Sequence, residues 1–234
     1  MTKAMPDPPH LAAHTVLIDV DETITHTRDD SFLYAALLDA VASAHGIDAT
    51  QADRRIRAVC DPNNEDVEPH LAALGIEMTD YLHALVEAAR PHVEAYADAV
   101  TMIRSLHETG FALYPATTNG RGACMAKLSA AGLGDVSGSP FFAELFGGAQ
   151  VSPEGKSGPT FYHALLKRID TDPRHVVMIG DNPQADLAYA KAAGIEQVIL
   201  PRREQPQPWI VEEDGGIYVD SLAIVPEFLE FRRC

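Results

Sequence analysis

Short apolar runs alternate with helical segments over most of this chain, and this alternation constrains the fold more than any other feature. Strand-like runs at 111–116, 175–179 and 197–200 are separated by segments whose apolar residues recur at helical spacing. Strands that alternate with helices of about 10–15 residues are typical of βαβ units, which build parallel sheets with right-handed crossovers. The pattern therefore predicts an α/β fold on a parallel sheet. The same reading predicts helices at 96–109, 121–131, 158–168 and 184–193, short strands near 146–151 and 217–219, and a helical C-terminal tail.

The first strand-like run is separated from the others by a block that contains only helix and turn signals. Thr15–Ile18 indicates a strand buried on both faces. The block that follows predicts helices at 31–45, 50–59, 65–74 and 79–89, the second of them capped by Thr50 with Asp53. We therefore expect a disordered tail at 1–12, a core domain formed by 13–27 and 96–234, and a helical domain inserted at 28–95.

Composition and charge limit the kinds of partner. The 18 Lys and Arg against 34 Asp and Glu give a formal charge of −16, which argues against nucleic acid and anionic membranes as partners. Cys60, Cys124 and Cys234 have no zinc or redox spacing and are expected to be free thiols. Residues 1–10 lack the apolar run of a signal peptide, and no run approaches the ~20 apolar residues of a membrane span, so we expect a cytoplasmic protein.

Reactive side chains follow the expected strands at their carboxyl ends, where open α/β sheets bind ligands. Asp19 and Asp21 end the first strand, two residues apart, so that one carboxylate can attack an electrophile or hold a metal while the other protonates a departing oxygen. An isolated pair of this kind is also compatible with a helix N-cap or a solvated turn. Thr118 and Asn119 end the second strand, where a hydroxyl can donate to phosphoryl oxygens or simply cap a helix.

Two further groups follow later in the chain. Lys156 lies in a loop that opens a helix, where a lysine is commonly only a surface charge. The apolar run 175–179 leads into Gly180-Asp181, with Asp186 five residues after Asp181 at a helix start. Such an arrangement suits a hard, oxygen-coordinated cation with a supporting carboxylate.

In order and spacing these four elements resemble the motifs of the haloacid dehalogenase (HAD) superfamily. Asp19-x-Asp21-x-Thr23 is similar to the first motif, Thr118-Asn119 to the second, Lys156 to the third, and Gly180-Asp181-x4-Asp186 to the fourth. The resemblance implies a Rossmann-like parallel-sheet core, and it identifies the helical block at 28–95 as the C1 cap of that family.

The resemblance also implies a role for each residue. Asp19 would be the nucleophile that forms an aspartyl-phosphate, and Asp21 the general acid and base. Thr118, Asn119 and Lys156 would bind the phosphoryl group. Asp19, Asp181 and the backbone carbonyl of Asp21 would hold Mg²⁺, and Asp186 would orient Lys156 or a metal-bound water.

The charges of these residues support the need for a cation. The four aspartates of the motifs and Lys156 sum to −3 if all are ionised, which would repel a phosphate dianion, and Mg²⁺ reduces the sum to −1.

Two positions depart from the family pattern. Glu22 stands where many members carry glycine, and Ser157 stands where proline is common.

The predicted activity is Mg²⁺-dependent hydrolysis of a small phosphorylated metabolite, since an acid at Asp21 favours phosphate esters over halides. A phosphomutase with the same motifs and a catalytically silent metal- or ligand-binding regulatory protein remain as alternatives. A receiver domain is excluded, because the carboxylate pair directly follows the first strand and a helical block comes next. The substrate and the oligomeric state do not follow from the sequence, nor does the effect on specificity of Glu22 or of the basic cluster Arg54, Arg55 and Arg57.

Overall fold

A six-stranded sheet forms the centre of the computed structural model, which describes residues 8–61 and 67–231. The strand order is β5-β2-β6-β7-β9-β8, and all neighbours are parallel except β8 and β9. The bounds are β5 Ala112–Pro115, β2 Thr15–Ile18, β6 Val176–Ile179, β7 Gln197–Pro201, β9 Ile217–Val219 and β8 Trp209–Val211. The predicted α/β class with a parallel sheet is confirmed.

Both faces of the sheet are buried, as the apolar strand sequences require. Along β6, Val177 and Ile179 point to one face while Val176 and Met178 point to the other, following the two-residue period of a strand. Helices α5 (Ala97–Thr109) and α6 (Arg121–Ala130) cover the first face. Helices α8 (Pro159–Arg168) and α9 (Tyr189–Ala192) cover the second, so the core has three layers.

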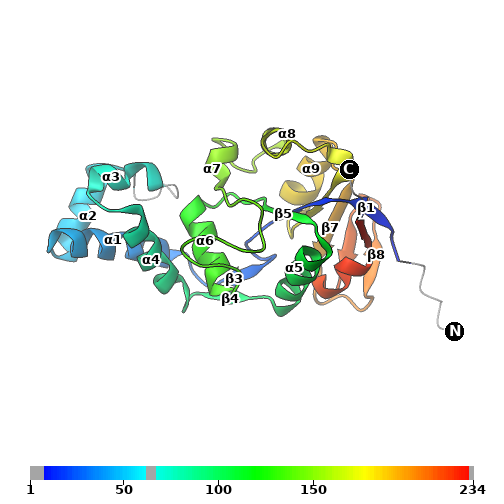
Figure 1. The fold of residues 1–234 in the computed structure, drawn as a ribbon, viewed down its shortest axis with the longest axis horizontal. Coiled ribbons are helices and arrows are strands. Elements are labelled where there is room, and N and C mark those ends of the chain that lie inside the picture. The colour runs from blue at the N-terminus through cyan, green and yellow to red at the C-terminus, as the bar shows by residue number, and fades with distance from the viewer. Residues whose placement is uncertain (1–7, 62–66, 232–234) are drawn as a thin grey trace.

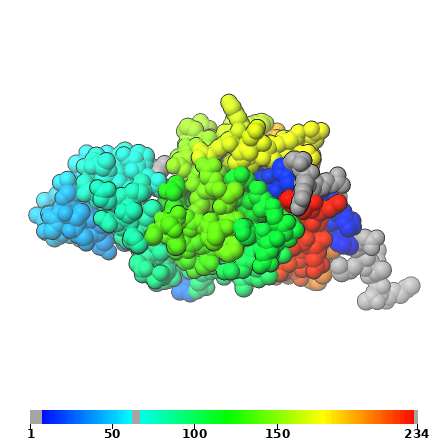
Figure 2. Space-filling view, viewed as in Figure 1, coloured from blue at the N-terminus to red at the C-terminus, as the bar shows by residue number. Residues whose placement is uncertain are grey.

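A separate group of helices lies to one side of the sheet and forms the lobe at the left of Figures 1 and 2. Its helices are α1 Ser31–His45, α2 Ala49–Arg57, α3 Leu71–Leu74 and α4 Met78–Ala89. Their apolar side chains form a hydrophobic cluster distinct from the two clusters of the sheet. We call these helices the cap.

The cap joins the core through a short antiparallel ribbon and rests on one core helix. Strands β3 (Thr25–Thr27) and β4 (Val93–Ala95) pair where the chain leaves and re-enters the core. Helix α4 of the cap packs on α6, and a Cβ added at Gly122 of α6 would lie 3.3 Å from the Leu85 Cδ2 of α4. The close approach of the two helices fixes where the cap contacts the sheet domain.

Several local predictions were wrong. The run 146–151 is not a strand, because Phe146 is buried beside the sheet and Gly148–Val151 makes one turn of helix, α7. The N-terminal tail does not extend to residue 12, because β1 (Leu11–Ala13) pairs with β10 (Leu229–Phe231). The expected C-terminal helix is only a 3-10 turn, Leu222–Glu227, followed by β10.

Two further differences concern the cap. Helix α2 begins one residue earlier than expected, and its N-cap is Asp48, whose carboxylate accepts the backbone N–H of Gln51 while the Gln51 side chain accepts that of Asp48. The segment 28–95 also ends in a strand, β4. A strand of three residues is too short to show the two-residue hydrophobic period from which a strand is predicted. Part of the helix predicted at 65–74 lies outside the described residues, as does most of the tail predicted at 1–12.

The cysteines and the helices bear on two other expectations. Cys60 and Cys124 are buried free thiols, and Cys234 lies outside the described residues. Over residues 8–61 and 67–231 we find no helix with the length and apolar character needed to cross a membrane.

The separate clusters predict separable responses to two matched substitutions. Leu85 in the cap and Leu113 in the sheet domain are both 0 % exposed, so Leu85→Ala and Leu113→Ala should each cost about 2–5 kcal/mol of local stability. Amide hydrogen exchange should speed up mainly in α1, α2 and α4 for the first variant and mainly in the sheet for the second. A uniform increase over both parts in either variant would show that cap and core open as one unit.

Candidate active site

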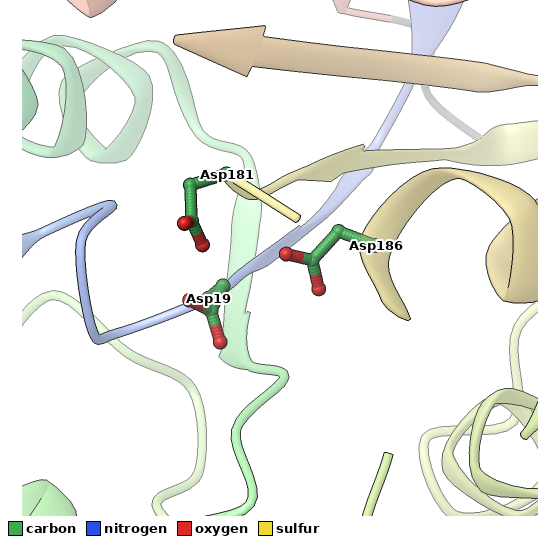
Figure 3. Close-up of side chains that lie close together, drawn as sticks. All are labelled: Asp19, Asp181 and Asp186. Atoms are coloured by element: carbon green, nitrogen blue, oxygen red, sulfur yellow. The ribbon is translucent and has the colours of Figure 1, made fainter. Parts of the chain in front are cut away.

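Three aspartates from two strand ends and one helix converge at the carboxyl edge of the sheet (Figure 3). Asp19 follows β2, Asp181 follows β6, and Asp186 lies in a π-helical segment, Pro183–Ala188. One carboxylate oxygen of each lies within 4.8 Å of the others. The adjacency of β2 and β6 in the sheet brings these residues together, although more than 160 positions separate Asp19 from Asp181 in the sequence.

Lys156 lies between two of these carboxylates. Its Nζ donates to Asp19 Oδ1 at 2.5 Å and to Asp186 Oδ1 at 2.6 Å. The three side chains are nearly inaccessible, with Asp186 0 % exposed. A buried charge needs a partner, and here a single ammonium pairs with two carboxylates.

Asp186 is positioned by its neighbours on every side. Its Oδ2 accepts the backbone N–H of Asn182 at 3.0 Å, and its Oδ1 accepts the Tyr162 hydroxyl at 3.3 Å. A Cβ at Gly180 would lie 2.3 Å from Asp186 Oδ2, so only glycine allows this carboxylate to reach the end of β6. The glycine before Asp181 thus makes room for the aspartate five residues further on.

Asp21 belongs to a second group of polar side chains beside the first. Its Oδ2 accepts from Asn119 Nδ2 at 2.6 Å, and its Oδ1 accepts from Lys127 Nζ at 2.7 Å. The second amide hydrogen of Asn119 goes to Thr117 Oγ1 at 2.9 Å. The Asn119 side chain, predicted to bind phosphate, is therefore engaged with Asp21 and Thr117 in this conformation.

Thr118 keeps an exposed side chain at the end of β5, facing the loop that carries Lys156. A Cβ at Gly155, which has φ +59°, would lie 2.9 Å from Thr118 Cγ2. The loop that carries Lys156 therefore approaches the Thr118 side chain closely.

Glu22, which departs from the family pattern, adopts a left-handed backbone with φ 56°. This conformation favours glycine, so Glu22 occupies a position that is strained for a residue with a side chain. The Glu22 carboxylate bonds to His26 Nδ1 at 2.8 Å and accepts from the Tyr96 hydroxyl at 2.9 Å. Arg203 secures the same turn from the core, because its guanidinium donates to the Glu22 and Thr23 carbonyl oxygens and stacks on the Tyr96 ring.

The basic cluster Arg54, Arg55 and Arg57 lies on α2, at the end of the cap away from the sheet (Figure 1). Arg57 pairs with Asp53 of the same helix at 2.9 Å. The cluster is therefore carried by a helix that lies far from the sheet edge where the aspartates converge.

Burial changes the acidity of the carboxylates. Desolvation by burial raises the pKa of Asp19 to about 7. The Lys156 charge lowers this pKa, and the Asp186 charge raises it. Desolvation and repulsion by Asp186 raise the pKa of Asp181 to about 6. For Lys156, burial is outweighed by Asp19 and Asp186, and its pKa is raised. The carboxylates therefore bind protons unusually well, and a bound cation would compete with those protons.

Two residues of this region were missed in the sequence. Lys127 is 1 % exposed on α6, and Tyr162 is 0 % exposed on α8. A signal for Lys127 was available, because it stands between Ala126 and Leu128 on a stretch of helix that is otherwise small or apolar. Tyr162 had no comparable signal, since a tyrosine on the apolar face of a helix is ordinary core.

The structure combines a parallel α/β sheet, a helical cap and three aspartates that converge at the carboxyl edge of the sheet. The sequence model of the haloacid dehalogenase-like hydrolases matches residues 13–194. The chain therefore belongs to the haloacid dehalogenase-like hydrolase family. A search of curated proteins gave no match.

Solved structures with the same fold have low sequence identity to this chain. A HAD phosphatase from Thermococcus onnurineus is 18 % identical with a TM-score of 0.53, covering 91 % of this chain and 96 % of its own. A protein assigned as a β-phosphoglucomutase from Thermotoga maritima is 18 % identical with a TM-score of 0.54, and the match covers 93 % of this chain and 97 % of that protein. CbbY from Rhodobacter sphaeroides, solved in complex with phosphate, is 19 % identical with a TM-score of 0.53, covering 90 % and 95 %. These similarities establish the fold.

The raised pKa values predict how Mg²⁺ stabilises the protein as pH changes. Because the folded pKa of Asp19, about 7, lies above its usual 3.8, the metal-free fold loses stability as pH rises from about 4 to 7. Mg²⁺ must displace protons from Asp19 and Asp181 at low pH, so its effect on Tm should be larger at pH 7.5 than at pH 5.5. Thermal unfolding with and without MgCl₂ measures this effect on Tm at each of the two pH values.

Asp181→Asn is the control for this prediction, and it should lose most of the increase in Tm at both pH values. An increase that is equal at the two pH values, or larger at pH 5.5, would contradict the assignment of these carboxylates to the cation.

Proposed function

We propose that this protein is a Mg²⁺-dependent phosphomonoester hydrolase that acts on a small phosphorylated metabolite through an aspartyl-phosphate. One observation carries the proposal: Lys156 bridges Asp19 and Asp186 at 2.5 and 2.6 Å, beside Asp181, at the end of adjacent parallel strands. Asp19 is a buried nucleophile beside the Lys156 ammonium, and the neighbouring carboxylates can bind a metal ion. This arrangement is suited to attack on an anionic phosphoryl group.

In the first step, an Asp19 carboxylate oxygen attacks phosphorus and the ester P–O bond breaks. The electron pair of that bond stays on the leaving oxygen, which takes a proton from the carboxyl of Asp21. Thr118 and Lys156 bind phosphoryl oxygens, so that the charge which builds up on them meets a hydroxyl donor and an ammonium. The products are the alcohol and a phosphorylated Asp19.

In the second step, a water molecule attacks the same phosphorus. Asp21, now a carboxylate, takes a proton from that water, and the bond between phosphorus and the Asp19 oxygen breaks. Inorganic phosphate leaves, and both aspartates return to their starting states. The covalent route divides one difficult displacement into two easier ones.

The donor set fits Mg²⁺, which prefers carboxylate and carbonyl oxygens. Both oxygens of Asp186 already accept hydrogen bonds from Lys156, Tyr162 and the Asn182 backbone. Asp19 Oδ2, by contrast, accepts a long bond of 3.3 Å from Thr23. We therefore assign the metal to Asp19 and Asp181, with Asp186 in support. The family resemblance adds the backbone carbonyl of Asp21 as a third ligand. When bound, the ion supplies positive charge that offsets the aspartates and the phosphate dianion.

We propose residues 28–95 as the cap domain that selects the substrate, with hinges near 25–30 and 92–97. The β3–β4 ribbon lies within these spans and is short enough to act as a hinge pair. We also place the enzyme in the cytoplasm, where the buried thiols Cys60 and Cys124 would stay reduced.

A phosphomutase is the second candidate, because one of the structures with this fold is assigned as a β-phosphoglucomutase. The two activities share the first step and differ in what accepts the phosphoryl group. A mutase would release little free phosphate, would form a substrate isomer and would require a bisphosphate activator.

The experiment is a phosphate-release screen over a panel of phosphorylated metabolites with Mg²⁺. Asp19→Asn should lower turnover of every active compound by about 10³-fold or more, because the amide cannot act as the nucleophile. Asp39→Asn, an exposed aspartate of α1, serves as the matched control and should retain wild-type turnover.

Removal of the metal by exhaustive chelation should abolish turnover, and added Mg²⁺ should restore it. Full turnover after chelation would refute the metal requirement. If wild type and Asp19→Asn behave alike on every compound, the protein is a silent binding protein rather than an enzyme.

A further inference from the structure

Lys127 is a buried lysine that the steps above do not use. It lies on α6, and its side chain is 1 % exposed. The Nζ meets three acceptors: Asp21 Oδ1 at 2.7 Å, Asp30 Oδ1 at 3.1 Å and Asn119 Oδ1 at 3.2 Å. An ammonium carries three hydrogens, so these three oxygens match its full donor capacity.

The same contacts surround the Asp21 carboxylate. Lys127 and the Thr27 hydroxyl donate to Oδ1, at 2.7 and 3.2 Å, and Asn119 donates to Oδ2 at 2.6 Å. Asn119 also bonds to Lys127, so the three side chains form a closed set of contacts. Asp21 itself is 39 % exposed on its side chain, and one part of it remains open to a bound substrate.

A buried lysine at this position destabilises the fold unless its charge is compensated. Burial of an ammonium is compensated only by well-placed partners, and an apolar side chain of similar length would pack on α6 without that cost. The neighbours Ala126 and Leu128 are buried and apolar, which shows that the helix face accepts such a residue. The charge is therefore best explained by what it does to Asp21.

We propose that Lys127 is a positioning residue that holds the Asp21 carboxylate in place for proton transfer to the leaving group and from water. The inference rests on the proposed hydrolase activity. Lys127 acts through Asp21 and Asn119 and touches neither the phosphoryl group nor the nucleophile. Its charge also changes the sum at the site, since the four aspartates with Lys156 and Lys127 amount to −2 rather than −3 if all are ionised.

The test compares two probes whose leaving groups differ in their need for a proton. p-Nitrophenolate leaves as a stable anion, whereas the alkoxide of glycerol 2-phosphate must be protonated as it departs. Lys127→Met should lower kcat/KM for glycerol 2-phosphate by about 10²-fold and kcat/KM for p-nitrophenyl phosphate by less than about 5-fold. We compare kcat/KM because it reports the steps up to departure of the leaving group, before the attack of water that both probes share. A residue with a purely structural role would lower both rates by the same factor.

Asp30→Asn is the matched control, because it removes another partner of the same ammonium and leaves Asp21 in contact with Lys127. The ratio of the two rates should stay at the wild-type value. If Lys127→Met does not fold, Lys127→Gln, which can still donate to Asp21, replaces it and should shift the ratio in the same direction by a smaller factor.

A thermal-unfolding cycle checks the contact independently of turnover. Asp21→Asn leaves a buried ammonium without its nearest carboxylate, so the double variant Asp21→Asn/Lys127→Met should have a higher Tm than Asp21→Asn alone. Equal loss of both rates in Lys127→Met, or additive Tm changes in the cycle, would overturn the role of Lys127 and leave the hydrolase proposal intact. No turnover by the wild type of either probe or of any compound in the metabolite panel would overturn both.

Discussion

The buried ion cluster of Asp19, Lys156 and Asp186 is the interaction on which the rest of the site depends. One ammonium pairs with two carboxylates in a region with almost no access to water. Each of these charges would be prohibitive alone, and each is tolerated because the others are present. Burial raises the pKa of both Asp19 and Asp181, and repulsion from Asp186 adds to the rise. The excess of negative charge that the cluster leaves suits the edge of the sheet to a cation.

The backbone makes this cluster possible. Strands β2 and β6 are neighbours and parallel, so their carboxyl ends deliver Asp19 and Asp181 to one place. Gly180 lets the Asp186 carboxylate approach the strand end, and the π-helical segment that carries Asp186 keeps it beside Tyr162. Local irregularities at a glycine and a π-helix therefore serve the geometry of the site rather than the stability of the core.

Helix α6 connects the site with the cap. One part of it, at Gly122 and Ala126, packs against the cap cluster, while Lys127 on the same helix reaches Asp21. Asp30, the residue directly before the first cap helix, lies 3.1 Å from the same ammonium. The proton-transfer side of the proposed reaction is thus built where cap and core meet, whereas the nucleophile lies deeper, at the edge of the sheet.

The sequence by itself determined the α/β class, the inserted helical segment and the order of the motif residues, because hydrophobic period, turn residues and motif spacing are local properties. Helix α1 was predicted with its observed bounds, Ser31–His45, for this reason. The sequence failed where a segment takes its structure from distant partners. Strands β1, β3, β4 and β10 are three residues each and exist only through pairing. At 146–151, Phe146 is buried in the core beside the sheet and is not part of a strand.

Only the tertiary structure decided which side chains meet. Asn119 and Lys127 both contact Asp21, and Tyr162 contacts Asp186. These contacts form only because the fold brings distant helices and strands together across the sheet. These contacts have no local period and no spacing rule. The free energy of a buried charge depends on every group around it, and those groups are assembled only when the chain has folded.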